Sequence, residues 1–528
     1  MKQKHPLRGY MTALAITTLS FSGADTVNAQ PPDAASIINK TCVSCHASEG
    51  PQAWSRISHQ RKTPEGWLMT IARMQNAHGV KISDEDRSTV VKYLADHQGL
   101  APSESEQGRY ALERRLNTIE QIGDQRYKEM CARCHSAARP TLQRRPEQEW
   151  RHLVNQHLGQ WPSLEYQQYS RDREWLKIAL EEMAPYMAKT YPMDSAAWEQ
   201  WKKRYPGSAA FAGGWSFSGH MPGKGELRGT MRVKPEQQDR YAVELQGQFA
   251  DGSPFNGKGQ ALVYTGYEWR AHLSVNGTPM RQVFSVQDGR MQGRMFEAEH
   301  DERGLDFSAA REDGPATVLS VQPAHIRRGS EATLTVIGTG LQGRPDFGSG
   351  VRVLSVKGSG NRMQVQVRAA ANAATGVRTA SVGNTPGYPV AIYDSVQQLK
   401  VIPAYSVARF GGNGGSRPKV QGRFDAEAWG KDAQGQDFRI GNMPASWSVQ
   451  PFNDIAKEER DLEFAGKMEA RHGIFTPGDA GPNPLRKMNA NNAGNLKVIA
   501  TVKDGKQSVP GEGQLIVTVP NWMDTPIP

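Results

Sequence analysis

Two short segments of the chain combine residue types and a spacing that can do chemistry. Segments 42–46 and 131–135 both read Cys-x-x-Cys-His, and together they use all four cysteines of the 528-residue sequence. This spacing is the attachment signature of c-type haem, in which both cysteines form thioethers to the porphyrin and the histidine ligates the iron. The sequence therefore predicts two covalently bound haem c groups. The attaching cysteines are Cys42, Cys45, Cys131 and Cys134, and the proximal ligands are His46 and His135.

Other uses of paired cysteines fit these segments less well. A redox-active Cys-x-x-Cys pair needs no histidine directly after it, and a zinc site needs one set of Cys and His side chains converging on a single ion. Since no cysteine remains for a disulfide, the other domains must be held together by burial of apolar side chains.

The residues around the two segments form an internal repeat that nominates the distal ligands. Each segment is followed by a Pro-Glu pair and then a tryptophan, Trp67 in the first unit and Trp150 in the second. Proline beside an acid is typical of the first turn of a helix. The seventh residue after each tryptophan is Met74 or His157, which lies two helical turns along the same face. We therefore predict Met74 opposite the proximal histidine of the first haem, and His157 opposite that of the second.

Some alternative distal ligands stay open. His78 lies one turn beyond Met74 on the same helical face and is its rival at the first haem. His152 precedes His157 by five residues, which turns it well away from the face of His157. More distant candidates for the second haem are Met183, Met187 and Met193.

The haem region has the pattern of helices and the remainder that of strands. Helices are expected from Pro64, from Ser83 with Asp86 in a capping box, over 171–189 and over 194–204. A three-helix unit of this kind, taken twice, resembles the class I cytochrome c fold. Past residue 206, alternating segments separated by Asp-Gly or Asn-Gly predict antiparallel hairpins, with turns at 251–252, 276–277 and 288–289.

A chain of this length is expected to form several domains. The predicted fold is an N-terminal all-α dihaem cytochrome c domain followed by three antiparallel all-β domains. The first β domain is expected to be a barrel or sandwich, and the next two to be immunoglobulin-like. The expected boundaries are 30–205 for the haem domain, then 206–315, 316–402 and 403–528 for the β domains.

The N-terminus is predicted to be a signal peptide. Three basic residues precede a short apolar run over 11–21, and small residues then lead to a cleavage site before Gln30, which gives a signal peptide of 1–29. The run is too short to span a membrane. We expect a periplasmic protein, because c-type haem is attached outside the bacterial cytoplasm. The net charge of +10 includes no basic block with interleaved aromatics, so nucleic acid is not an expected partner.

An exported dihaem region followed by three β domains of this order and size resembles the α subunit of quinohaemoprotein amine dehydrogenase. The resemblance covers nearly all of the mature chain and implies two partners, a propeller-like β subunit and a small γ subunit. In that family the γ subunit carries cysteine tryptophylquinone, which oxidises a primary amine to an aldehyde and ammonia. The resemblance implies that the haems of this chain pass the electrons to an external cytochrome c or blue copper protein.

The residues themselves agree with this division of labour. Haem iron with both axial positions filled by protein relays electrons and does not bind substrate. The chain has no cysteine left for a quinone crosslink, so no catalytic residue for amine oxidation is expected on it. Two alternative functions are a dihaem peroxidase, which needs one haem with an open distal side, and a stand-alone periplasmic electron carrier.

Overall fold

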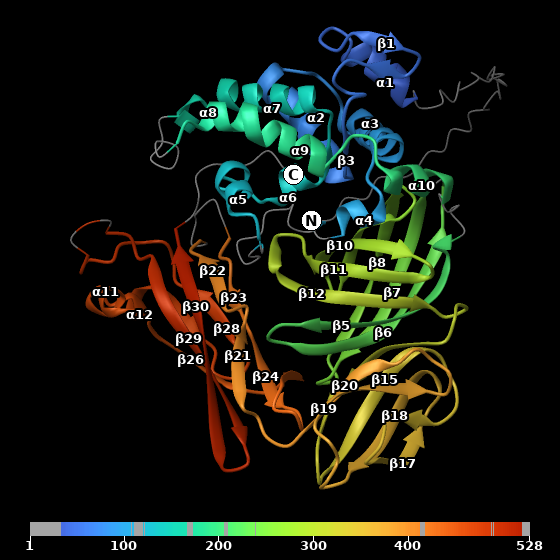
Figure 1. The fold of residues 1–528 in the computed structure, drawn as a ribbon, viewed down its shortest axis with the longest axis vertical. Helices are drawn as coiled ribbons and strands as arrows, with labels where there is room; N and C mark the ends of the chain where they lie inside the picture. The colour runs from blue at the N-terminus through green and yellow to red at the C-terminus, as the bar shows by residue number, and fades with distance from the viewer. Residues whose placement is uncertain are drawn as a thin grey trace, which may run out of the picture.

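The computed structural model describes residues 33–106, 108–109, 120, 122–165, 173–204, 210–237, 239–411, 418–486, 488 and 490–519. The predicted signal peptide lies outside these residues. In Figure 1 a helical region lies across one end of an eight-stranded barrel, and two further β regions follow, one at the far end of the barrel and one beside it. Among the described residues, no helix combines the length and the apolar character needed to cross a bilayer.

The helices of the haem region begin where local signals predict them. Pro64 is the first residue of its helix, after the N-cap Thr63, and the Ser83 side chain accepts from the Asp86 N–H at 3.0 Å. These two predicted helix starts are therefore confirmed. The helices are α1 (Ala34–Thr41), α2 (Pro64–His78), α3 (Asp84–His97), α4 (Pro102–Ser105), α5 (Gln125–Cys131), α6 (Ala138–Thr141), α7 (Glu147–Gln160), α8 (Trp175–Ile178), α9 (Ala184–Thr190) and α10 (Ala196–Arg204).

The helix expected over 171–189 differs in detail from the prediction. Within the described residues it begins at Trp175 as α8, passes through a π-helical turn over Ala179–Met183, and continues as α9 to Thr190. A π-helical turn inserts one extra residue per turn, so it changes the face that later side chains present. The helix expected over 194–204 is α10, which begins at Ala196.

The barrel is closed and antiparallel, in the order β10-β11-β12-β5-β6-β7-β8-β9. Its interior is a packed aromatic core, in which the Phe307 ring stacks on both Phe217 and Phe284, with centroids 5.0 and 4.6 Å apart. Asn276 and Asp288 have positive φ at hairpin turns, as Asn-Gly and Asp-Gly pairs predict. The strands are β5 (Gly213–Met221), β6 (Gly225–Pro235), β7 (Arg240–Phe249), β8 (Pro254–Tyr264), β9 (Glu268–Val275), β10 (Thr278–Gln287), β11 (Arg290–Glu297) and β12 (His300–Arg311).

The next β region is a sandwich of two four-stranded sheets that share one apolar core. Leu334 and Val365 from one sheet pack against Val390 and Ile392 from the other. One sheet contains β13 (Thr317–Gln322), β15 (Glu331–Leu341), β18 (Gly360–Ala369) and β17 (Val351–Lys357); the other contains β14 (His325–Arg327), β20 (Tyr388–Tyr393), β19 (Gly376–Val382) and β16 (Pro345–Asp346).

The described residues of the C-terminal region form three sheets and two short helices. Its longest hairpin joins β29 and β30, which pair antiparallel from Gly494↔Val517 to Asp504↔Gln507. The sheets are β21 (Gln398–Ile402), β24 (Asp425–Lys431) and β25 (Asp437–Asn442); β22 (Tyr405–Arg409), β30 (Gln507–Thr518), β29 (Gly494–Asp504) and β26 (Ser446–Pro451); and β23 (Gly422–Arg423), β28 (Ile474–Pro477) and β27 (Gly466–Met468). The helices are α11 (Asp454–Glu458) and α12 (Asp461–Phe464).

The predicted fold class is wrong. The N-terminal region is not all-α, because it also contains β1 (Ser48–Gly50), β2 (Ala53–Trp54), β3 (Arg61–Lys62) and β4 (Gln143–Arg144). The β regions are not purely antiparallel either, because β14 pairs with β20, and β22 with β30, in parallel. Strands of two or three residues are too short to show a sequence period, and alternation gives the face of a strand but not the direction of its neighbour.

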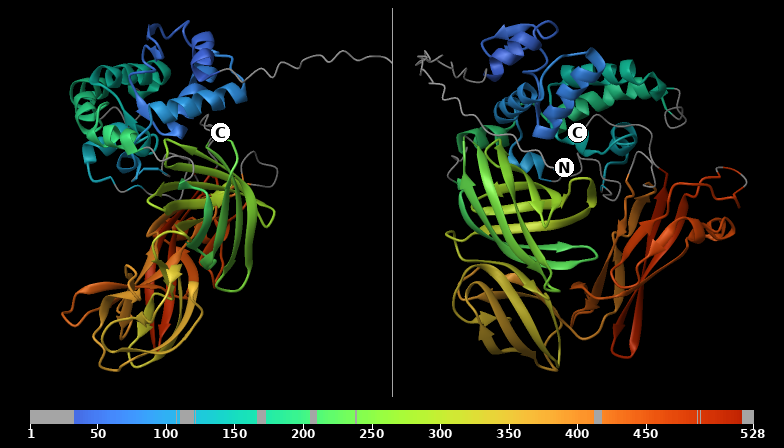
Figure 2. Two further views of the ribbon diagram at one scale, coloured as in Figure 1. Left: turned by 90° about the vertical axis from the view of Figure 1, so that its right-hand side faces the viewer. Right: turned by 180° about the vertical axis from the view of Figure 1, so that it is seen from behind.

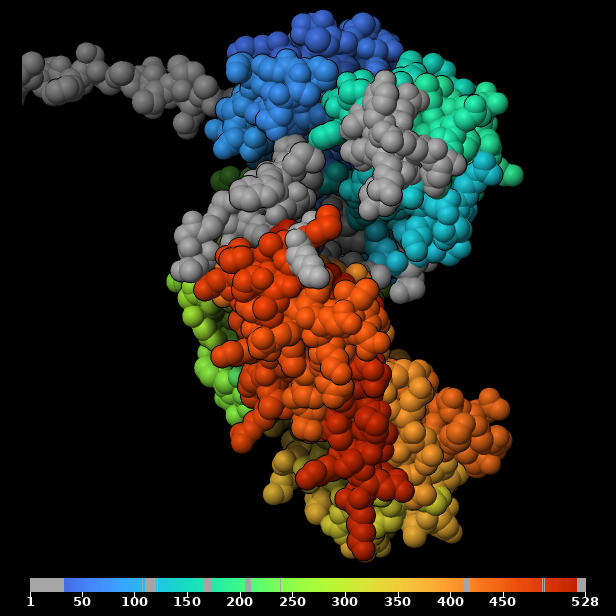
Figure 3. All heavy atoms as spheres, turned by 90° about the vertical axis from the view of Figure 1, so that its left-hand side faces the viewer, coloured from blue at the N-terminus to red at the C-terminus, as the bar shows by residue number. Residues whose placement is uncertain are grey.

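Buried polar contacts fix the helical region to the rim of the barrel. The Tyr267 hydroxyl lies 2.7 Å from Ser105 Oγ and donates to Glu268 at 2.9 Å. Arg270 of the same barrel edge pairs with Glu268 and with Glu65 of α2. Figure 2 shows the helices seated on this end of the barrel from two further sides, and Figure 3 shows them as a cap above the C-terminal sheets. These contacts fasten α2 and α4 to the rim of the barrel.

Candidate functional site

The second Cys-x-x-Cys-His segment lies opposite the helix that carries its predicted distal ligand. His135 follows the end of α5, and His157 lies in the last turn of α7. Their ring centroids are 6.4 Å apart, with the ring planes tilted by 48°. A metal–imidazole bond is about 2 Å and the ring centroid lies about 1 Å farther, so one ion between two imidazoles separates the centroids by roughly 6 Å. The gap between the two rings therefore fits a single iron.

Backbone carbonyls orient both imidazoles. His135 Nδ1 lies 2.8 Å from the carbonyl oxygen of Ser136, and His157 Nδ1 lies 2.8 Å from that of Leu153. A carbonyl oxygen only accepts, so Nδ1 carries the proton in each ring and Nε2 is left as the ligand atom. Holding the second ring nitrogen in this way is the usual support of a metal-ligating histidine.

Burial keeps both imidazoles neutral. Desolvation lowers the pKa of His135 to about 4, against a smaller opposing effect of its bond to Ser136, and the charge of Arg139 lowers it further. Desolvation also lowers the pKa of His157, and the positive charges of Arg73 and Arg145 act in the same direction. Neutral imidazole is the form that binds a metal ion, so this pair is ready to ligate at neutral pH.

The cysteines of both segments lie at or just beyond the ends of helices. Cys131 is the last residue of α5 and Cys42 caps the end of α1. In each segment one cysteine is half-buried and the other, Cys45 or Cys134, is exposed. The paired cysteines thus lie at the boundary between helix and solvent.

At the first segment, the proximal histidine is oriented but the distal ligand is not settled between two candidates. His46 Nδ1 lies 2.9 Å from the carbonyl oxygen of Ser55, which again leaves Nε2 as the ligand atom. Met74 is half-buried on α2, and His78 is exposed at the last residue of that helix. Among the described residues, His46 forms no hydrogen bond or ring contact with His78. The assignment of Met74 over His78 as the distal ligand of the first haem stays a prediction.

The alternative ligands of the second haem have different surroundings. Met183 and Met187 are buried in the apolar cluster around Tyr127 and Trp150, against which Cys131 also packs. His152 faces Gln148, with 3.3 Å between Gln148 Nε2 and His152 Nε2. Met193 is half-buried, and its backbone carbonyl accepts from Arg61 Nε at 2.7 Å. The ring contact of His135 is with His157, which favours the predicted pair.

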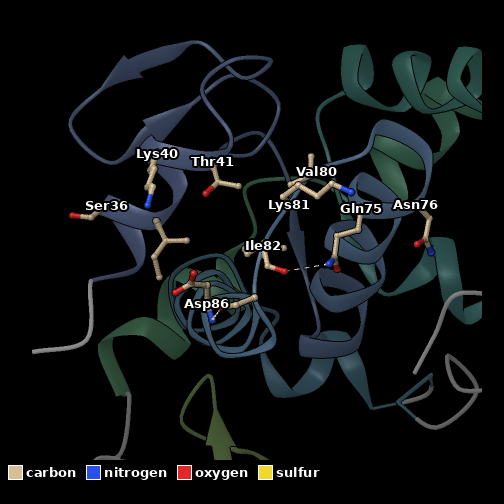
Figure 4. A pocket seen from close by; sticks show the side chains of 11 residues that line it. Ser36, Lys40, Thr41, Gln75, Asn76, Val80, Lys81, Ile82 and Asp86 are labelled. Atoms are coloured by element: carbon tan, nitrogen blue, oxygen red, sulfur yellow. Dashed lines mark hydrogen bonds between the residues drawn. The ribbon is translucent and has the colours of Figure 1, made fainter. Parts of the chain in front are cut away.

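A cavity of about 690 Å³ adjoins the first segment. It begins beside Cys42, because Thr41 is part of its wall, and this volume lies within the range of small-molecule sites. Figure 4 shows Lys40 on one side, Asp86 below, and Gln75 bonded to the Ile82 carbonyl. The walls come from α1, the end of α2, the loop before α3, and α3 itself: Ser36, Ile37, Lys40, Thr41, Gln75, Asn76, Val80, Lys81, Ile82, Ser83 and Asp86.

A pair of short strands joins the two units. In β3 and β4, Arg61 lies opposite Arg144 and Lys62 opposite Gln143. Arg61 and Arg144 both bind the carboxylate of Glu104, at 2.9 and 3.0 Å. Burial raises the pKa of Glu104, but the hydrogen bond from Arg61 and the two positive charges outweigh this and hold it at about 2. This carboxylate is ionised at all physiological pH values.

Sequence reasoning missed these basic residues, although a signal for them exists. The internal repeat extends upstream of each Pro-Glu pair, where the sequence reads Gln-Arg-Lys over 60–62 and Gln-Arg-Arg over 143–145. Both triplets are buried or nearly so, which basic residues rarely are unless they are paired. The repeated basic triplets before the two ligand helices therefore mark the paired strands that join the haem units.

Four family models match the chain in succession. Their descriptions are "Quinohemoprotein amine dehydrogenase A, alpha subunit, haem binding" over 33–198, domain II of the same alpha subunit over 208–312, domain III over 315–394 and domain IV over 399–527. No curated protein sequence matches the chain.

Similarity to solved structures is weak. A redesigned β barrel, mFAP1, bound to DFHBI is 16% identical with a TM-score of 0.18, and the match covers 20% of this chain and 96% of that one. Rv2717c from M. tuberculosis is 13% identical with a TM-score of 0.14, and the match covers 30% of this chain and 93% of that one. Gamma-CGTase from Alkalophilic bacillus clarkii is 9% identical with a TM-score of 0.15, and the match covers 48% of this chain and 41% of that one.

Proposed function

Because the chain belongs to the quinohemoprotein amine dehydrogenase alpha-subunit family, we propose that it is the dihaem electron-transfer subunit of a periplasmic complex that oxidises primary amines. The observation that carries this proposal is the His135–His157 pair, with a centroid separation of 6.4 Å and both Nε2 atoms available. In this proposal the two histidines are the axial ligands of one haem c, and the neighbouring Cys131 and Cys134 are its covalent anchors.

The chain's own residues would hold two haem c groups, which supply one-electron transfer when bound. Cys42 and Cys45 anchor the first, with His46 as the proximal ligand and Met74 as the proposed distal ligand. The second is anchored by Cys131 and Cys134 and ligated by His135 and His157. At the second site, the carbonyl oxygens of Ser136 and Leu153 hold the two imidazoles in place, which limits the reorganisation that electron transfer would require.

The amine chemistry is proposed to take place on a partner. An iron with two axial protein ligands has no open position for a substrate. Such an iron suits an electron relay, whereas a peroxidase needs an open position. We therefore place cysteine tryptophylquinone on a small γ subunit, beside a propeller-like β subunit, with an external cytochrome c or blue copper protein as the acceptor. The signal peptide over 1–29 would bring the chain to the periplasm, where c-type haem is attached.

The test is to purify the protein from the periplasm of its native host and to measure what it carries. We expect two further subunits, two haems per chain by the pyridine haemochrome assay, and haem reduction on addition of a primary amine to the complex. The separated chain should be reduced by dithionite but not by amine. Amine-driven reduction of the separated chain, or a high-spin ferric haem that reacts with peroxide, would contradict the proposal.

A further inference from the structure

The two ligand helices begin from one pair of short strands, at equivalent positions of the repeat. In the pair β3 and β4, Arg61 lies directly opposite Arg144, and each arginine lies two residues before the N-cap of the helix that follows. Met74 follows Arg61 by thirteen residues, and His157 follows Arg144 by the same interval. Residues that face each other in an antiparallel pair are related by a local twofold axis. The starts of α2 and α7 are therefore arranged symmetrically about the point where these two arginines meet.

The carboxylate of Glu104 occupies this point. It accepts hydrogen bonds from Nη1 and Nη2 of Arg61 at 2.9 and 3.0 Å, and from Nε of Arg144 at 3.0 Å. Ser195 Oγ and the backbone N–H of Ala101 each donate to it at 2.8 Å. A bond from both prongs of a guanidinium group fixes orientation as well as distance. Glu104 therefore determines how the two arginines, and with them the two strands, lie relative to each other.

Burial and further hydrogen bonds hold both arginines in place. Arg61 is 2% exposed and Arg144 is 6% exposed. Arg61 Nε donates to the carbonyl oxygen of Met193 at 2.7 Å, and Arg144 Nη1 donates to that of Thr141 at 2.7 Å. Because a buried donor that loses its acceptor is costly, neither strand can shift without breaking several such bonds. The geometry at the starts of the two ligand helices is therefore fixed.

Glu104 is also fastened to the barrel. It belongs to α4, whose next residue, Ser105, lies 2.7 Å from the hydroxyl of Tyr267, and both of these residues are fully buried. Figure 1 shows α4 between β3 and the barrel. A continuous series of buried polar contacts therefore runs from the barrel rim through Glu104 to the start of each ligand helix. The barrel serves as the base on which both helices are placed.

We propose that Glu104 is a positioning residue for electron transfer between the two haems, because it sets the starts of both ligand helices and thereby the separation of the two irons. This inference rests on the proposed function, since it presumes a haem at each Cys-x-x-Cys-His segment. In the transfer one haem is oxidised and the other is reduced by one electron, and no bond or proton is exchanged. Its rate falls steeply with the separation of the two redox centres, so a small displacement of one helix slows it.

The test uses the full complex with Glu104→Asp, Arg144→Lys and the control Arg151→Lys. Glu104→Asp keeps the charge but withdraws the carboxylate from the arginines, and Arg144→Lys keeps the charge but removes the planar fork of donors. Arg151 is on the same helix as His157, but its side chain is 37% exposed and pairs with Glu147 in solvent. The readouts are haem content, the midpoint potential of each haem, the distance between the two low-spin ferric irons by pulsed electron paramagnetic resonance, and the rate of interhaem transfer after pulse radiolysis.

We expect Glu104→Asp and Arg144→Lys to bind two haems with unchanged potentials, to broaden the distribution of iron–iron distances, and to slow interhaem transfer several-fold. Arg151→Lys should match the wild type in every readout. Wild-type distances in both variants overturn the inference, even if potentials or rates change, because the cluster would then act through its charge and not by positioning. If one of the two variants does not accumulate, the other decides the question. A wild-type chain with fewer than two haems would instead contradict the proposed function.

Discussion

Arg61 lies directly opposite Arg144 in the antiparallel pair of β3 and β4, and both guanidinium groups bind one carboxylate, that of Glu104. Like charges opposite one another on paired strands repel. The arrangement is stable because Glu104 lies between them, with Ser195 Oγ donating to it at 2.8 Å. Since one arginine precedes each ligand helix, this carboxylate joins the two haem units to each other.

Glu104→Gln should therefore destabilise the haem region. Removing the carboxylate leaves two arginines buried without an anion, which typically costs about 3–5 kcal/mol. The pKa of Glu104 is about 2 in the folded chain, below the ordinary value of 4.5, so its contribution is present above pH 4.5 and is lost as the pH falls toward 2. Thermal unfolding from pH 2 to 7 measures this. Glu106→Gln, at an exposed position beside α4, is the control; equal stability of the two variants at pH 7 would contradict the prediction.

Met74→His should change the first haem and leave the second unaffected. A thioether ligand raises the potential of haem iron relative to a second imidazole, so the substitution should lower the potential of the first haem. If electrons enter at the His135/His157 haem and leave from the His46/Met74 haem, transfer to the external acceptor slows while amine-driven reduction of the second haem continues. Stopped-flow kinetics at separate haem wavelengths distinguish the two steps. Loss of amine-driven reduction at the second haem would mean that the order is reversed.

Near-infrared magnetic circular dichroism should identify the ligands directly. The wild-type protein is expected to show one His/Met and one His/His low-spin ferric haem, because His135 faces His157 across an iron-sized gap and Met74 is the residue predicted for the first haem. Two His/His signatures would replace Met74 by His78. The variant His78→Gln keeps the wild-type spectrum if Met74 is the ligand.

His220→Gln should weaken the contact between the barrel and the C-terminal region. The imidazole lies 2.8 Å from Glu226 and 3.0 Å from Asp425 of β24. Burial by itself lowers the pKa of His220. The hydrogen bonds to Asp425 and Glu226 raise it by more than burial lowers it, so the pKa is about 10. A pKa raised above the ordinary 6.5 stabilises the fold fully below pH 6.5, and this contribution is lost as the pH rises to 10. Hydrogen bonds to charged groups contribute about 1.5–3 kcal/mol each.

The measurement for His220 is the unfolding midpoint of wild type and variant at several pH values from 6 to 10.5. The difference between them should be largest near pH 6 and should shrink steadily as the pH rises from 6.5 to 10. His272→Gln is a control, because His272 lies on a barrel strand and burial lowers its pKa. A difference that does not depend on pH would show that His220 acts by packing alone.

The sequence alone was sufficient for features that are local along the chain. The predicted haem attachment needs only five consecutive residues. The starts of α2 and α3 depend on the caps Thr63 and Ser83, and hairpin turns depend on pairs such as Asn276-Gly277. Each depends on covalent spacing or on hydrogen bonds within a few residues, so a pattern can indicate it. The seven-residue interval after Trp150 likewise nominated His157, because helix geometry is regular.

Only the tertiary structure decided the features that depend on residues far apart in the chain. Local alternation could not reveal that β22 runs parallel to β30, because strand direction is set by the path of the whole chain. Nor could it show that Glu104 lies between Arg61 and Arg144, or that Ser105 meets Tyr267 of the barrel. The burial of these two arginines, which makes a carboxylate beside them necessary, is a property of the folded chain.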